Sequence, residues 1–97
     1  MSYNDLVTAD IRLVILLALV EAAGYSSNEY VLHRMIEVNG HKCSRDQLHT
    51  QLAWLHEQGL VTICAAPVIV ATVTGRGADV AAGRVTVPGV QRPAPKD

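Results

Sequence analysis

SRDQLHTQLAWLHEQGLV, residues 44–61, is the stretch that decides the fold of this chain. Ser44 can cap the start of a helix, and Gln47, three residues later, can complete a capping box. Apolar residues then recur at four- and three-residue spacing, which predicts one apolar stripe along a helix, at Leu48, Leu52 and Leu55. Gly59 supplies the left-handed residue that commonly ends a helix. The stretch therefore predicts a short capped helix with a polar outer face, followed by a strand.

A second helix is expected directly before this stretch. The cap Ser26-Ser27-Asn28 precedes residues 29–38, which carry apolar residues on one side. The polar residues of this helix are expected to face outward, namely Glu29, His33, Arg34 and Glu37. Asn39-Gly40 ends the helix, and His41-Lys42-Cys43 leaves a very short turn before the next cap. Helix, tight turn and capped helix in this order are typical of a helix-turn-helix.

Two β-branched runs follow, at residues 60–64 and 68–73. Ala65-Ala66-Pro67 joins them, which predicts a β-hairpin with a short, uncharged tip. Residues 74–77 predict a turn, and residues 78–83 predict one or two helical turns.

One domain is expected, over residues 1–84, because 97 residues suffice for a single core. The chain has no Phe and one Trp, so the core must be aliphatic, with Trp54 in the core or in an interface. Residues 85–97 show no periodicity and contain several prolines. They predict an extended C-terminal tail that is disordered unless it docks on something.

The first helix is expected over residues 11–23, with its cap near Thr8-Ala9-Asp10 or, earlier, at Ser2 or Asn4. It is apolar nearly all round, whereas one small domain should cover only one face of such a helix. The sequence therefore predicts a homodimer in which this helix packs against its mate. The expected interface residues are Leu13, Val14, Leu16, Leu17 and Val20.

Charge, cysteine usage and hydropathy limit the function. The formal net charge of -1 gives no overall basic field for nucleic acid, although a local basic patch is compatible with it. Two cysteines fit a reducing cytoplasm, and the apolar run at residues 13–20 is too short to span a bilayer. The His and Cys residues lack the spacing of a metal site, and no phosphate loop, carboxylate pair or nucleophile elbow indicates an enzyme. We expect a soluble cytoplasmic protein with no catalytic residue, metal or cofactor.

Residues 28–73 resemble the winged-helix transcription regulators of the ArsR and MarR type. The pattern Ser44-x-x-Gln47-Leu48-x-x-x-Leu52-x-x-Leu55-x-x-x-Gly59-Leu60-Val61 matches the recognition helix of that family without a gap. Residues 73–81 look like the segment that follows the wing, and the whole chain is similar to short winged-helix proteins of Mu-like phages and prophages. The resemblance implies an α+β winged helix-turn-helix fold with three helices, a two-stranded β-hairpin wing, a short C-terminal helical turn and an extended tail.

The resemblance also implies a sequence-specific transcriptional regulator, of phage or prophage origin, that binds double-stranded DNA as a dimer. Polar side chains on the outer face of the capped helix would contact bases, and nearby cations would contact phosphates. The expected DNA-binding residues are Lys42, Ser44, Arg45, Gln47, His49, Thr50, Gln51 and Arg76. The alternative is a protein-interaction adaptor with the same fold, because many winged helices bind proteins. A basic rim around Arg45 would favour DNA, and a neutral or acidic face would favour the adaptor.

Overall fold

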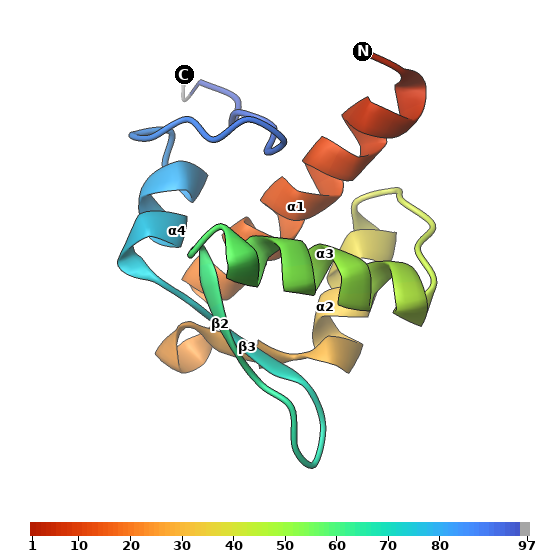
Figure 1. The fold of residues 1–97 in the computed structure, drawn as a ribbon, viewed down its shortest axis with the longest axis vertical. Coiled ribbons are helices and arrows are strands. Elements are labelled where there is room, and N and C mark those ends of the chain that lie inside the picture. Colours follow the sequence, from red (N-terminus) through yellow and green to blue (C-terminus); the bar gives the residue numbers. More distant parts are fainter. Residues whose placement is uncertain (96–97) are drawn as a thin grey trace.

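The structure of the protein, a computed structural model, describes residues 1–95. These residues form a small α+β fold with four α-helices, one 3₁₀ helix and a three-stranded antiparallel sheet (Figure 1). The elements are α1 (Tyr3–Glu21), η1 (Ala23–Tyr25), β1 (Ser26–Asn28), α2 (Glu29–Val38), α3 (Arg45–Glu57), β2 (Val61–Cys64), β3 (Val70–Val73) and α4 (Gly75–Ala81). The strand order is β1-β3-β2, so the last strand of the chain lies between the other two.

The expectation of a two-stranded hairpin was incomplete, because a third strand precedes α2. β1 pairs with β3 from Ser26 opposite Thr72 to Asn28 opposite Val70, and the hydroxyl oxygens of Ser26 and Thr72 lie 2.5 Å apart. Three polar residues carry no alternation that marks a strand, so their sequence indicated only a helix cap. Asn28 is both the last residue of β1 and the cap of α2, since its Oδ1 accepts a hydrogen bond from the backbone N–H of Val31.

The expectation of three helices also needs correction. The short helical turn expected near residue 78 is a seven-residue helix, α4, and it begins at Gly75. Thr74 caps it, because the Thr74 Oγ1 accepts a hydrogen bond from the Gly77 N–H at 3.0 Å. Residues 1–95 therefore contain four α-helices.

The predicted boundaries of α3 are confirmed. Gln47 N donates to Ser44 Oγ at 3.1 Å, and Ser44 N donates to Gln47 Oε1 at 2.8 Å, which is the expected capping box. Gly59 has a φ of 74°, in the left-handed region. α1 begins at the earliest of the expected positions, because Ser2 and Asp5 form a second capping box there.

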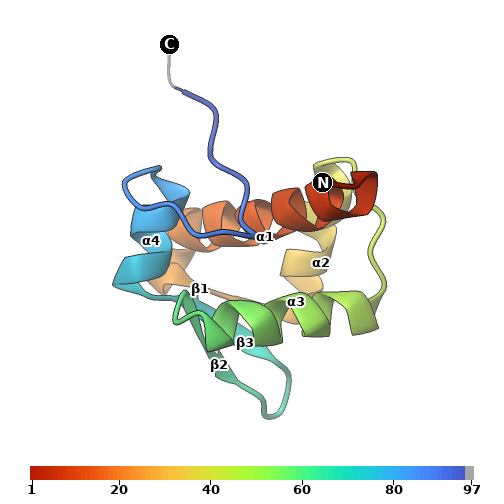
Figure 2. The ribbon, with the colours of Figure 1, turned by 45° about the horizontal axis from the view of Figure 1, so that its top comes forward.

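The core is aliphatic, as the composition predicts. In Figure 2, α1 runs above α2, α3 and the sheet, α4 lies at the C-terminal end of α1, and the tail passes along α1. The largest fully buried side chains are Ile15, Leu16, Leu19, Leu32, Ile36, Leu48, Leu55, Leu60 and Val61. Within residues 1–95, no helix combines the length and the apolar content that crossing a bilayer requires.

Most of the residues expected at a dimer interface on α1 are covered by the protein's own core. Leu13, Val14 and Leu16 are buried within the protein's own core, and Val20 is half-buried against it. Leu17 differs, because 39% of it is exposed. One chain covers this apolar helix because α4 and the tail pack on it in addition to α2 and the sheet.

The C-terminal tail docks on α1 and α3 over the part that the structure describes, and residues 96–97 lie outside that part. Val87 and Val90 belong to the core cluster. Arg12 of α1 connects the tail to α3, since its Nη1 donates to the Gly89 carbonyl at 3.0 Å and its guanidinium lies 3.7 Å from the centroid of the Trp54 ring. The tail thus covers a side of α1 that would otherwise meet water.

Replacing Gly89 with alanine should loosen this docking. Gly89 has a φ of 97°, and an added Cβ would lie 2.9 Å from both Arg12 Nη1 and Trp54 Cζ2. We expect a loss of about 1–3 kcal/mol in the free energy of unfolding, measured by urea denaturation. Gly40→Ala is the matched control, because Gly40 has a similar φ of 90° but no atom within 4 Å of an added Cβ. Equal losses in the two variants would contradict a packed tail.

Candidate nucleic-acid interface

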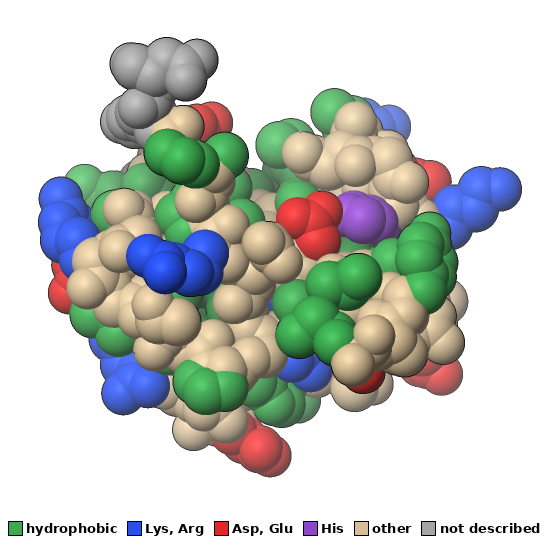
Figure 3. All heavy atoms as spheres, turned by 90° about the horizontal axis from the view of Figure 1, so that it is seen from above, with side chains coloured by type: hydrophobic (Ala, Val, Ile, Leu, Met, Phe, Trp, Pro, Cys, Tyr) green, Lys and Arg blue, Asp and Glu red, His purple; other side chains and the backbone are tan. Residues whose placement is uncertain are grey.

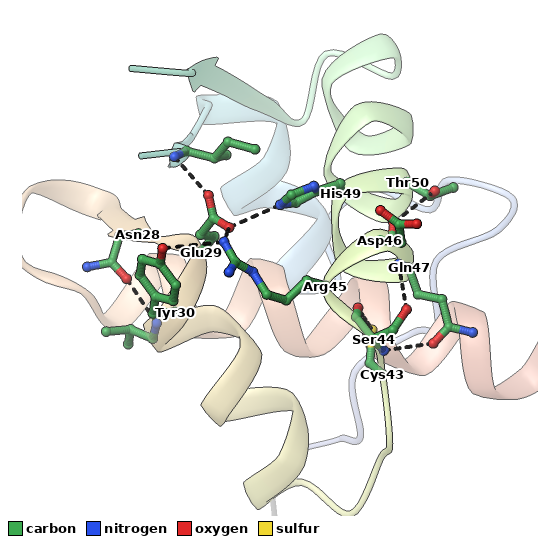
Figure 4. Close-up of polar contacts among 12 residues, drawn as sticks. Asn28, Glu29, Tyr30, Cys43, Ser44, Arg45, Asp46, Gln47, His49 and Thr50 are labelled. Atoms are coloured by element: carbon green, nitrogen blue, oxygen red, sulfur yellow. Dashed lines mark hydrogen bonds and ion pairs between the residues drawn. The ribbon is translucent and has the colours of Figure 1, made fainter. Parts of the chain in front are cut away.

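The candidate interface is built from α2, the turn after it and the N-terminal half of α3. The capping box starts α3 at Arg45, and the leucine stripe holds the opposite side of the helix in the core. Arg45, Asp46 and Thr50 are consequently exposed, while His49 is half-buried. Figure 4 shows this region, in which side chains of α2 and α3 point toward one another.

A buried carboxylate, Glu29, organises the interface. Only 5% of Glu29 is exposed, although its position in the first turn of α2 predicted an outward side chain. Its Oε1 accepts hydrogen bonds from Arg45 Nη2 at 2.5 Å and from His49 Nε2 at 3.1 Å, and its Oε2 accepts one from the backbone N–H of Ile69 at 3.0 Å (Figure 4). One side chain therefore ties together α2, α3 and the segment that leads into β3.

These contacts favour the ionised form of Glu29. The hydrogen bonds from Arg45, His49 and Ile69, in that order of effect, lower the pKa of Glu29 to about 2 from an ordinary 4.5, against the opposing effect of burial. The same ion pair raises the pKa of the Arg45 guanidinium. The charges of Glu29 and Arg45 are thus both present across the physiological pH range.

Arg45 is held in one orientation but remains partly open to solvent. Its side chain is 56% exposed. Its Nη2 also donates to the Tyr30 hydroxyl at 3.3 Å, and its guanidinium lies 4.8 Å from the centroid of the Tyr30 ring. Among residues 1–95, its Nε and Nη1 have no hydrogen-bond partner, so they are available to a ligand.

Most of the other expected DNA-binding side chains on α3 already have partners within the protein. Ser44 and Gln47 form the capping box, and the Thr50 hydroxyl donates to the Asp46 carbonyl at 3.1 Å. Gln51 Oε1 accepts a hydrogen bond from Arg12 Nε at 2.7 Å. Sequence spacing placed these residues on the polar side of a helix, but it could not show that each has a partner in the cap, in the helix backbone or on α1.

Lys42 and Arg76, the two residues expected to contact phosphates, lie on different elements. Lys42 is exposed in the turn that leads into α3, next to the Arg45 end of the helix. Arg76 is exposed on α4, which lies near the other end of α3 in both ribbon views (Figures 1 and 2). Lys42 lines a pocket with residues of α1 and with Gln47, whereas Arg45 lines a pocket with residues of α2. The two cations therefore do not share a pocket, and Arg76 lies outside the interface.

Two residues of this site, Glu29 and Tyr30, were not among those expected from the sequence. An acid in the first turn of a helix is usually a surface residue that interacts with the helix dipole, so its type gave no signal of burial. The only available signal was that Arg45 and His49 are four residues apart and therefore lie on one face of α3. That spacing indicates a shared partner without identifying it.

The two cysteines differ in exposure: Cys43, just before α3, is buried, and Cys64, at the end of β2, is exposed. Burial raises the pKa of the Cys43 thiol. In the described part of the chain, no three His, Cys, Asp or Glu side chains come together as metal ligands would.

Two known proteins are similar to this chain. The uncharacterized protein gp26 of Escherichia phage Mu is 45% identical over 94 residues, which cover 96% of this chain and 97% of gp26. An uncharacterized protein of Haemophilus influenzae is 49% identical over 63 residues, which cover 65% of this chain and 61% of that protein. No family model matches the chain, and no solved structure matches it. The identity to gp26 over nearly the full length of both proteins shows that the chain belongs to the family of phage Mu gp26.

Proposed function

We propose that this chain is a winged helix-turn-helix protein that binds double-stranded DNA through α3 and regulates transcription. The element order, helix, strand, two helices and a hairpin, together with the strand order β1-β3-β2, supports the winged-helix assignment. In such a domain, α3 is the recognition helix and β2–β3 is the wing. The relationship to a phage Mu protein supports a phage or prophage origin and action in the bacterial cytoplasm.

The observation that carries the proposal is the oriented, exposed Arg45 at the first position of α3. A recognition helix contacts bases through its N-terminal residues, and arginine reads guanine by donating two hydrogen bonds to O6 and N7. Glu29 and Tyr30 hold Nη2 and so orient the guanidinium, which lowers the conformational entropy lost on binding. Both two-pronged donor edges of a guanidinium include Nη2, so the guanine contact requires Nη2 to exchange one of these two partners for the base. Lys42, three residues earlier and exposed, is suited to a phosphate.

The proposed contact set is smaller than the set expected from sequence. Arg45 is proposed to reach base edges through its guanidinium, and Thr50 only through its methyl group, because its hydroxyl donates to the Asp46 carbonyl. Lys42 is proposed to contact the DNA backbone, and His49 to support Arg45 because both donate to the Glu29 carboxylate. Ser44, Gln47 and Gln51 are proposed to position α3 instead.

The test is selection from a random pool of DNA duplexes, followed by a mobility shift with the enriched sequence. Arg45→Ala and Arg45→Lys should each weaken binding to that sequence by about 1–3 kcal/mol, since lysine keeps the charge but loses the two-pronged donor. Arg76→Ala is the matched control, because it removes an exposed arginine from α4, and it should change affinity little. Failure to enrich any sequence would overturn the proposal.

A protein-interaction adaptor is the second candidate, and the charge distribution favours it. The tip of the β2–β3 hairpin, residues 65–67, carries no charge, Asp46 is exposed on α3, and the net charge is -1. On the face shown in Figure 3, the Lys and Arg side chains are separated from one another and interspersed with Asp and Glu. Unselective or undetectable DNA binding in the experiment above would support this candidate.

A further inference from the structure

A surface groove of about 810 Å³ lies between α1, the end of α4 and the tail. Leu13 and Leu17 line it on the α1 side, residues 81–84 follow from α4, and residues 92–95 form the opposite wall. Among residues 1–95, the charged side chains that line the groove are Arg84 and Arg92. The groove is thus an apolar channel with positive charge at its rim.

Hydrophobic side chains are exposed in and beside this groove. Leu17 is 39% exposed, and Val85, which follows the groove residues of α4, is 40% exposed. The other apolar residues of α1 between Leu13 and Leu19 are buried or half-buried, so Leu17 is the residue in this half of α1 that offers exposed apolar surface. Exposed apolar surface within a concave site is typical of a contact surface.

The arginines at the groove are opposite in charge to Glu21 at the C-terminal end of α1. Glu21 lies one turn beyond Leu17, on the same face of α1, and it is exposed. Among residues 1–95, neither Glu21 nor Arg92 has an ion-pair partner, whereas Arg84 lies 3.4 Å from Asp79. The exposed Glu21 therefore follows the apolar residues Leu13 and Leu17 along α1, next to a groove whose Arg92 has no ion-pair partner within residues 1–95.

We propose that this groove receives α1 of a second copy, in a two-fold dimer with Leu17 at the axis. When the two copies of α1 cross antiparallel at Leu17, position 17 + n of one helix lies opposite position 17 − n of the other. Glu21 of the partner subunit therefore lies opposite Leu13. Leu13 and the arginines line the same groove, and Glu21 of the partner subunit meets Arg92 there. The exposed face of α1 at Leu17 and Glu21 and the groove beside it are complementary to each other in the two copies, as a two-fold interface requires. This dimer does not depend on DNA binding.

The deciding measurement is sedimentation equilibrium of the full chain without DNA, at concentrations from about 1 to 100 μM. The wild-type protein should sediment with the mass of two chains. Leu17→Glu should give a monomer with an unchanged circular dichroism spectrum. The matched control is Leu6→Glu, at an exposed position of the same helix outside the groove, which should stay dimeric.

Charge reversal tests the register of the two helices. Glu21→Arg and Arg92→Glu should each raise the dimer Kd about tenfold, and the double variant should restore it, because the pair is rebuilt with exchanged signs. A monomeric wild-type protein, a dimer that survives Leu17→Glu, or a double variant no tighter than either single one would overturn the proposal. Binding of an acidic apolar peptide to a monomeric wild-type protein would show that the groove has a different occupant.

Discussion

Gly77→Ala is expected to cost the protein about 3 kcal/mol or more of its free energy of unfolding. An added Cβ would lie 2.1 Å from the Leu60 carbonyl oxygen and 2.7 Å from Val73 Cγ2. The Leu60 oxygen is backbone, and it also accepts the hydrogen bond from the Thr74 N–H at 3.0 Å, so it cannot move aside without breaking the junction of α3, β3 and α4. Overlap of this size with backbone forces the elements apart, which is among the most damaging changes to a packed core.

Urea denaturation of Gly77→Ala beside Gly75→Ala tests this explanation. Both glycines lie in the first turn of α4, but an alanine Cβ at Gly75 meets no atom within 4 Å. Gly75→Ala should therefore be neutral or should stabilise the helix by about 0.5–1 kcal/mol. Similar denaturation midpoints for the two variants would rule out the close approach of α4 to Leu60.

Glu29→Gln should have the largest effect of any polar substitution at the interface. The Glu29 carboxylate accepts hydrogen bonds from three donors, whereas glutamine offers one carbonyl oxygen and places an amide N–H against another donor. The result should be a lower midpoint of thermal unfolding and a loss of the fixed Arg45 orientation. Glu37→Gln is the control, because Glu37 is an exposed acid on the same helix and should change little.

The pH dependence of stability gives this prediction a specific signature. The pKa of Glu29 is lowered to about 2 in the folded protein, against 4.5 for an ordinary glutamate, so its contribution is complete above pH 4.5 and declines as the pH falls toward 2. Thermal unfolding of the wild-type protein between these values should show this loss, and Glu29→Gln should show a smaller one. Parallel pH profiles for the two proteins would exclude the proposed ionised, buried Glu29.

The elements that local interactions decide are the ones that the sequence predicts most accurately. The capping box of Ser44 and Gln47, the stripe of leucines and the left-handed Gly59 place α3 within a residue of its observed bounds. The hairpin of β2 and β3 followed from two β-branched runs in the same way. These signals work because each depends on residues that are neighbours in the chain.

The site was harder to predict, because its side chains meet across distances that local patterns do not record. Arg45 and Gln51 both had the polar character expected for base contacts, but Gln51 is engaged by Arg12, which is 39 residues away in the chain. Arg45 is paired with Glu29 at a separation of 16 residues. Which polar residue is free and which is engaged depends on partners that folding brings together.

The sequence by itself determined the α+β class, the aliphatic core, the caps of the helices and the helix–turn–helix order, because hydrophobic spacing and backbone preferences are local. Only the tertiary structure decided that Ser26–Asn28 becomes a strand, that Glu29 is buried and that the tail covers α1. A three-residue strand has no stability of its own and forms because β3 supplies its hydrogen-bond partners. A carboxylate is buried only where donors from other elements replace water, and here those donors come from α3 and the segment before β3.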